Sequence, residues 1–485
     1  MVDAPADRPV DDASDRPPRS AAQSRRIATL WGRCRSAFGG VSAQSAYLVI
    51  ALIWGLLLCA VVPPFQQFDE VAHFYRAWSL SAGQAAPDAS SRVTLPTAVA
   101  GLPASLDFIE VGEGRAPYSL HLTLELLGDT SLGPPVQTIC FAGNPNPLGH
   151  VPATVGVGLA RVLHLSPLAA LYAARVANLL AAAFLVFFAI RLLPYGKPLF
   201  VLVGLLPMTI TQFAAVNPDA LTIAGAMLFL AVVLRLRSAG QLRTATLVML
   251  VVTGLMALNV KPGYVAFAFL GFLIPRESFG SRRRWLVWLA ILVAGTFGVT
   301  ALNQVLSPPS DPQTIKALYG AATQVDPAAQ ADIVLTHPGA FLAALRTTAG
   351  TGSLGIAANM VGIFGRGFVP LSQMAVLLVL AALVATLVAT RDGPSLGWRG
   401  RALVFAVCGV TSVIVAFAMY LGATAVGAGA IAGLQGRYFI PVLAAGLFAV
   451  YGLRRPPRWM VPIILALLAV TLAASSLLAL LRYYY

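Results

Sequence analysis

The chain alternates between long apolar runs and short polar connections over most of its length. A helix of about 20 apolar residues crosses the hydrocarbon layer of a membrane, which is roughly 30 Å thick. The candidate spans begin at Ala46, Leu168, Pro198, Ala220, Thr244, Gly263, Arg284, Val369, Arg401, Arg437 and Trp459. The pattern predicts an all-α polytopic membrane protein with about eleven transmembrane helices.

The connections between alternate spans are basic. If the N-terminus is cytoplasmic, the inner connections read RLLPYGK, RLRSAGQLR, PRESFGSRRR, RDGPSLGWRGR and RRPPR. Together with the N-terminal segment they hold 22 of the 33 Lys and Arg residues, although the outer connections are longer. Because Lys and Arg concentrate in cytoplasmic loops, this agreement favours a multi-pass protein with a cytoplasmic N-terminus.

Composition and span parity define the domain organisation. Residues 1–43 are polar and lack apolar periodicity, which predicts a disordered cytoplasmic tail. The transmembrane domain occupies residues 44–485, with long outer connections at 63–167 and 304–368. The segment HVPATVGVGLARVL, residues 150–163, is a short candidate span, but counting it would place SRRR and WRGR outside. We therefore interpret it as a helix that lies on the outer membrane surface or dips into it.

The overall composition excludes several classes of protein. The chain is 58% hydrophobic and 11% charged, with a mean hydropathy of +0.78, which is too apolar for a soluble domain. The formal net charge of +14 arises largely from the basic clusters between apolar runs, so it indicates topology and not a nucleic-acid partner. The four cysteines have neither a plausible disulfide pairing nor a zinc-site spacing.

Acidic residues follow the apolar runs at two places. Asp69 and Glu70 lie in PPFQQFDEVAHFYRAWSLSAG, and Asp219 lies in AAVNPDALTIAG. Ionisable groups are costly at membrane depth and mark functional sites there. Since the predicted topology places all three on the outer side, we interpret them as catalytic residues of one site. The alternative is that they cap helices or stabilise first turns.

Basic and histidine side chains accompany these acids. A helix that begins at Asp69 would carry His73 and Arg76 on the same face. Lys261 in NVKPGY and Arg437 in QGRYFIP lie at outer span ends, against the positive-inside bias. Outer cations favour an anionic ligand, above all phosphate, so these four side chains are predicted to bind substrate. The alternative for Lys261 and Arg437 is that they snorkel to the interface.

Other basic residues and histidines are weaker candidates for the predicted site. Weaker candidates for the anion are Arg175, Arg346 and Arg366. The histidines interpreted as surface residues, not as ligands, are His121, His150 and His337.

This set of residues suggests a reaction class. A carboxylate can act as general base on an acceptor hydroxyl, and Arg or Lys can stabilise a departing phosphate. The chain has no P-loop, Rossmann fingerprint or sugar-nucleotide motif. An enzyme working on the outer face would therefore need a donor carried by a lipid.

Several motifs occur together in a familiar order. These are the Asp69 segment, PNPLGHVPATVGVGLARVL, AARVANLL, LPMTITQFAAVNPDAL, NVKPGY and QGRYFIP. As a set they resemble a bacterial integral membrane family catalogued as a domain of unknown function. That family is similar to the GT-C glycosyltransferases, and the resemblance runs from about Tyr47 to Leu481.

The resemblance implies a GT-C-like fold in the bacterial inner (cytoplasmic) membrane, with surface-lying helices in the first outer loop. It implies an essential acid at Asp69 with Glu70, and a second acid at Asp219. The donor would be a polyprenyl-phosphate-linked sugar, and the acceptor an envelope glycan or lipid. Some GT-C members use a divalent metal ion, so that cofactor is left open, with Asp69, Glu70, Asp219 and a histidine as its ligands. The segment PLGHVP departs from the aromatic-Pro-Pro start of relatives, so the resemblance implies no acceptor contacts there.

The leading hypothesis is therefore a glycosyltransferase that uses an Asp general base. An alternative is a transporter or flippase of lipid-linked saccharides, which would place polar groups through the spans and show an internal repeat. A further alternative is a non-catalytic scaffold in a polysaccharide assembly complex. Polar residues gather at the outer span ends, which favours the enzyme.

Overall fold

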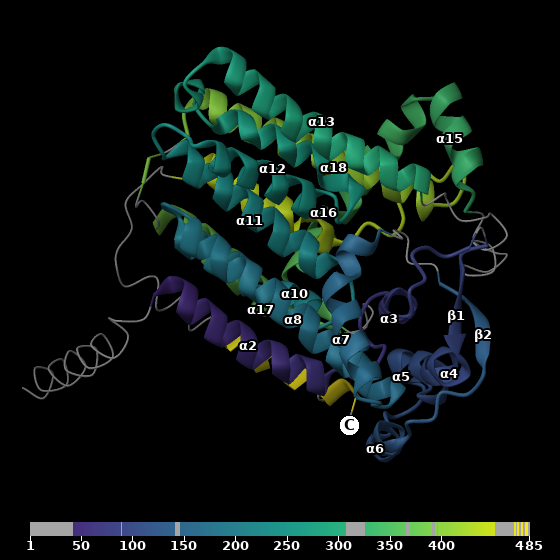
Figure 1. Ribbon diagram of the computed structural model, residues 1–485. Coiled ribbons are helices and arrows are strands. Elements are labelled where there is room, and N and C mark those ends of the chain that lie inside the picture. Colours follow the sequence, from purple (N-terminus) through teal and green to yellow (C-terminus); the bar gives the residue numbers. More distant parts are fainter. Residues whose placement is uncertain are drawn as a thin grey trace, which may run out of the picture.

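The computed structural model describes residues 42–88, 90–140, 146–306, 325–364, 369–389, 393–394 and 396–451, together with part of 470–483. In these residues the chain is mostly helical (Figure 1). The helices of the apolar part lie side by side, and the segment between the first two of them forms a separate lobe at one end. The predicted tail, residues 1–43, falls almost entirely outside the described residues.

Five described helices are long and apolar enough to cross a membrane. They are α2 (Ala43–Val61), α8 (Pro167–Leu192), α11 (Asp219–Arg237), α13 (Arg282–Leu306) and α18 (Trp398–Gly422). The shorter apolar elements are α12 (Thr244–Leu258), the 3-10 helix η3 (Pro262–Leu273), α17 (Gln373–Ala389), and η6 (Gly436–Phe439) with α19 (Ile440–Val450). The protein is thus a membrane protein with several apolar helices.

The predicted span that begins at Pro198 is broken. It consists of α9 (Lys197–Gly204) and α10 (Pro207–Phe213). Proline has no backbone N–H to donate to the preceding turn, and its ring clashes with the carbonyl four residues before it. Pro207 therefore starts a new helix. Of the predicted span that begins at Trp459, the structure describes only scattered residues from Val470 on, and these are helical.

The helix ends sort into two groups. At one end, Arg237 donates to the carbonyl of Leu273, and Arg284 donates to that of Leu242, which joins predicted inner connections. At the opposite end, Arg175 donates to the carbonyl of Pro63, which joins segments of the predicted outer side. These contacts join predicted inner connections with each other and predicted outer segments with each other.

The first long connection is a compact lobe rather than a loop with helices alone. Its elements are α3 (Glu70–Ser81), β1 (Arg92–Pro96), α4 (Thr97–Ser105), α5 (Phe108–Glu113), α6 (Leu120–Gly128), β2 (Pro135–Ile139), η2 (Pro147–His150) and α7 (Val151–Val162). Strands β1 and β2 pair antiparallel, with Arg92 opposite Ile139 and Pro96 opposite Pro135. The all-α prediction is wrong for this part, because alternating burial along β1 packs Val93 and Leu95 into the core of the lobe.

The second long connection, residues 304–368, also contains regular structure. It includes α15 (Pro327–Thr336), α16 (Gly339–Gly362) and the short strand β3 (Ile363–Phe364), which pairs with β4 (Val369–Pro370). Helix α16 packs against η6 and α10.

Helix α7 corresponds to the segment predicted to lie on the membrane surface. Its 12 residues rise about 18 Å, well short of the hydrocarbon thickness. One face packs on α8 and α3, whereas Val155 and Leu159 on the other face are 63% and 57% exposed. An apolar face without a protein partner is typical of a helix lying in the membrane interface.

A spin label at Val155→Cys in lipid nanodiscs should therefore collide readily with oxygen and poorly with a water-soluble nickel complex. The matched control is Ser105→Cys, because Ser105 is a polar, exposed residue at the end of α4. Power-saturation measurements give both accessibilities. Equal contact of the two labels with the nickel complex would contradict an interfacial position of α7.

Candidate functional site

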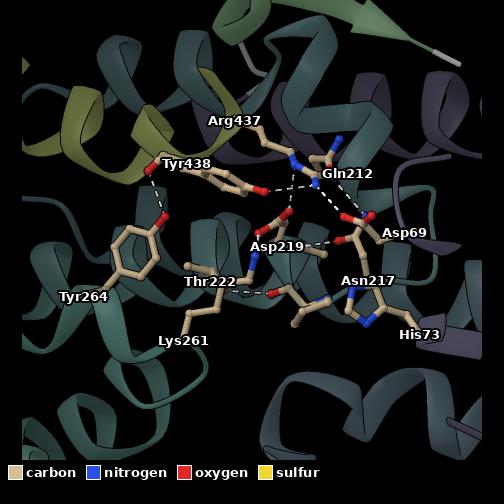
Figure 2. A network of polar contacts seen from close by, with 12 residues as sticks. Asp69, His73, Gln212, Asn217, Asp219, Thr222, Lys261, Tyr264, Arg437 and Tyr438 are labelled. Atoms are coloured by element: carbon tan, nitrogen blue, oxygen red, sulfur yellow. Dashed lines mark hydrogen bonds and ion pairs between the residues drawn. The ribbon is translucent and has the colours of Figure 1, made fainter. Parts of the chain in front are cut away.

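Arg437 lies at the centre of an ion-pair cluster formed where several helices begin (Figure 2). Its Nη2 donates to Asp69 Oδ2 over 2.8 Å, and its Nε lies 3.3 Å from Asp219 Oδ2. Lys261 Nζ donates to the other oxygen of Asp219. The structure thus joins four predicted site residues from η6, the start of α3, the start of α11 and the turn before η3.

Asp69 does not act as a helix cap. It precedes α3 in the left-handed region, with φ at 59°, and its side chain makes no capping hydrogen bond. Non-glycine residues are rare in this conformation and often mark functional sites. The carboxylate instead points to Arg437 and remains 60% exposed, the most accessible member of the cluster.

The electrostatic surroundings keep Asp69 ionised. Partial burial of this carboxyl raises its pKa, but the positive charges of Arg437 and Lys261 and the hydrogen bond from Arg437 outweigh that effect and set the pKa below its ordinary value. Solvent screens part of this effect, because the side chain is largely accessible.

Asp219 is also free of a capping role. Asn217 takes that role, since its Oδ1 accepts a hydrogen bond from the backbone N–H of Ala220. The Asp219 side chain is only 5% exposed, and it is paired with both Lys261 and Arg437. A carboxylate buried in this way, between two cations, is held in one orientation.

Residues that the sequence did not single out complete the cluster. Gln212 Oε1 accepts from Asn217 Nδ2 and from Arg437 Nη1, at 3.0 and 3.3 Å. Tyr438 lies under both cations, 5.1 Å from Lys261 Nζ and 5.2 Å from the Arg437 guanidinium carbon. The sequence carries only weak indications that these two residues belong to the cluster: Gln212 is a polar residue in an apolar run, and Tyr438 adjoins Arg437.

Glu70 belongs to a different interaction, which corrects its prediction as a catalytic residue. Both of its oxygens accept from Arg175, at 2.8 and 2.6 Å, and both side chains are fully buried. The remaining lone pairs accept the backbone N–H groups of Phe65 and Val216. With every partner inside the protein, Glu70 is a structural residue, and Arg175 is not available to a ligand.

Replacing Glu70 by Ala should destabilise the protein by about 3–5 kcal/mol, because the Arg175 charge would stay buried without its partner. Thermal unfolding of the purified protein in detergent measures the change. Glu110→Ala is the matched control, since Glu110 forms an exposed ion pair with Arg115. Similar unfolding temperatures for the two variants would contradict this role of Glu70.

Arg76 also lies apart from the cluster, although it was predicted to share a face with Asp69 and His73. It is fully buried and donates to the carbonyls of Gln84 and Ala85, at 3.2 and 2.5 Å. It thereby fixes the chain after α3 and does not face the predicted substrate. Helical spacing alone could not show which way its long side chain would turn.

Two histidines are buried and two are exposed, which differs from the prediction for His150. His73 is 5% exposed, and its Nδ1 lies 3.0 Å from Nε2 of His150, which is 1% exposed. His150 was interpreted as a surface residue, and that interpretation is wrong, because η2 packs against α3 and the turn before α11. His121 and His337 are exposed, as expected.

The remaining weaker candidates gain no support. Arg346 is exposed on α16, and Arg366 lies outside the described residues. Among the described residues no group of three or more His, Cys, Asp or Glu side chains could hold a metal ion. The ligand set considered from the sequence is not assembled, because Glu70 is bound to Arg175 while Asp69 and Asp219 are bound to cations.

Gly436 allows Arg437 to reach the cluster. A Cβ atom at this position would clash with the backbone of Ile356 and Met360 in α16. The N–H of Gly436 also donates to Asn359 Oδ1 over 3.0 Å. Close contact between η6 and α16 therefore sets the position of the guanidinium.

The Gly436→Ala variant should be destabilised by about 1–3 kcal/mol, because neither backbone can give way without moving a helix. Unfolding in increasing SDS measures the difference. Gly446→Ala provides the control, since Gly446 lies in α19 and has nothing within 4 Å of an added Cβ. Equal resistance of the two variants would mean that the contact with α16 is not required.

The fold and this cluster define a class: a membrane protein with a buried ion-pair network at one end of its helices. A family model described as "Predicted membrane protein (DUF2142)" matches residues 52–445, so the chain belongs to this family. No curated protein and no solved structure matches it.

Proposed function

We propose that the protein is a membrane glycosyltransferase that moves a sugar from a polyprenyl-phosphate carrier to a cell-envelope glycan or lipid. The observation that carries this proposal is the convergence of Asp69 and Asp219 on Arg437, with Lys261 beside them. These groups derive from distant parts of the chain, and neither acid has the capping role that would explain it otherwise.

Asp69 is the general base in this proposal, because its carboxylate is ionised and accessible. The acceptor hydroxyl attacks the anomeric carbon, a new C–O bond forms, and the hydroxyl proton passes to Asp69. The bond from the anomeric carbon to the phosphate oxygen breaks at the same time. A single displacement of this kind inverts the anomeric configuration.

Lys261 and Arg437 receive the leaving phosphate. The Lys261 side chain is 22% exposed, which makes it the more accessible cation. When Asp69 takes the proton, it loses its charge and releases its hold on Arg437 Nη2. That guanidinium then becomes available as the phosphate gains negative charge, so the proton transfer and the stabilisation of the leaving group support each other.

The proposal includes a topology. The chain would lie in the bacterial inner membrane with about eleven spans, a cytoplasmic N-terminus and a GT-C-like first outer loop. The cluster would then face the outer side, where a lipid-linked donor can reach it from the bilayer. The interfacial position expected for α7 supports such a boundary site.

The distribution of charge supports an enzyme over a transporter. In the five candidate spans the charged side chains lie in the first or last turns, apart from Arg175, which is paired with Glu70. A transporter fold carries its substrate and ion sites near the middle of the bilayer. The polar network of this protein lies at one end instead.

Asp69→Asn should reduce sugar transfer by about 10²- to 10⁴-fold, since an amide cannot accept the hydroxyl proton. The assay compares envelope glycans by mass spectrometry in a strain lacking the protein, with and without each variant. Absence of one sugar substituent and accumulation of its lipid-phosphate donor identify the reaction.

Asp107→Asn is a close control for this experiment. Asp107 also precedes a helix in the left-handed conformation without a capping hydrogen bond, but it lies at α5, away from the cluster. It should retain full transfer. A strain in which Asp69→Asn restores the substituent fully would exclude Asp69 as the base and favour a scaffold.

A further inference from the structure

A chain of hydrogen bonds leads from the backbone to the cluster through two buried histidines. His150 Nδ1 lies 3.2 Å from the carbonyl oxygen of Asn146. His150 Nε2 lies 3.0 Å from His73 Nδ1. Asn146 is itself fixed, because its Nδ2 donates to the carbonyl of Asn259 and its Oδ1 accepts from the N–H of Leu148.

The Asn146 carbonyl at one end of this series of hydrogen bonds determines which ring nitrogens carry a proton. A carbonyl oxygen can only accept, so His150 Nδ1 must carry a hydrogen. Both rings are neutral, because burial lowers the pKa of His73 to about 4 and that of His150 well below its ordinary value. His150 Nε2 is therefore an acceptor, and His73 Nδ1 must be the donor to it. His73 Nε2 is left with a lone pair and no hydrogen.

The ring of His73 lies beside Asp69 at the cluster (Figure 2). Among the described residues no side chain donates to its Nε2, and this atom is not sealed off from solvent. A ligand that displaces solvent from this atom must donate to it in turn, because an acceptor left buried without a donor is costly.

We propose that His73 Nε2 is the hydrogen-bond acceptor for a ligand hydroxyl, and that His150 and Asn146 are positioning residues that hold it in this tautomer. The inference rests on the proposed transferase function and adds a specificity to it. The hydroxyl is one other than the attacking group, whose proton goes to Asp69. A ligand in which that hydroxyl is methylated, acylated or absent leaves Nε2 unpaired and is disfavoured.

The tautomer can be observed without knowing the substrate. Full-length protein with ¹⁵N-labelled histidine, in lipid nanodiscs, gives separate NMR signals for protonated and unprotonated ring nitrogens. The five histidines are assigned from single variants. We expect His73 to show a protonated Nδ1 and an unprotonated Nε2 at neutral pH. A protonated Nε2 in His73 would overturn the inference.

A pair of substitutions at His150 tests its role. The side chain of Gln in His150→Gln can accept from His73 Nδ1 and donate to the Asn146 carbonyl, whereas His150→Phe can do neither. The Phe variant should mix the two His73 tautomers in the NMR spectrum and lower transfer in cells about tenfold, the effect of one lost hydrogen bond. The Gln variant should keep the wild-type tautomer and most of the transfer.

The two proposals can fail separately. If Asp69→Asn retains transfer, the proposed function fails, while the His73 tautomer is measured independently. If Asp69→Asn abolishes transfer but the Gln and Phe variants at His150 transfer equally, the positioning role fails and the base assignment stands. A Phe variant that does not fold leaves the wild-type NMR spectrum as the deciding measurement.

Discussion

The buried ion pair between Glu70 and Arg175 is the interaction on which the site depends. All five N–H groups of the Arg175 guanidinium are used, two by Glu70 and three by the carbonyls of Cys59, Val62 and Pro63 at the end of α2. Glu70 in turn accepts the N–H of Val216 before α11. Because an unpaired charge would be costly in this dry environment, the pair can form only when the end of α2, the interior of α8, the start of α3 and the turn before α11 all meet.

This constraint places the two carboxylates of the cluster. Asp69 directly precedes Glu70, and its left-handed backbone turns the two neighbouring acids in different directions, one into the protein and one toward Arg437. Asp219 follows Val216 by a single short turn, which Asn178 of α8 also holds through the carbonyls of Ala215 and Asn217. Arg437 arrives from the far end of the chain, guided by the contact of Gly436 with α16.

Hydropathy and charge asymmetry predicted much of this arrangement. They located the apolar helices and the two ends of the bundle, and they brought Asp69, Asp219, Lys261 and Arg437 to the same end. They could not assign roles within the Asp69–Glu70 pair, because the backbone conformation that separates them is local and leaves no periodic signal.

The sequence analysis misjudged Arg76 and His150 for a related reason: burial of a single polar side chain depends on tertiary partners distant in sequence. The two-stranded sheet was missed because β1 and β2 are five residues each and lie 38 residues apart.

Burial keeps His73 and His150 neutral, and the charge balance of the neighbouring cluster agrees with this state. Two carboxylates face two cations, so the cluster carries no net charge before a ligand enters. A protonated His73 would add a third cation beside Lys261 and Arg437, and it could no longer accept a hydrogen bond through Nε2. In the proposed transfer, the proton that reaches Asp69 offsets the charge gained by the leaving phosphate, so the total charge of the site and its ligands stays constant through the reaction. Asp219 cannot replace Asp69 in this role, because its two oxygens are already held by Lys261 and Arg437 in a buried position, where neutralising it would leave both cations with too little negative charge.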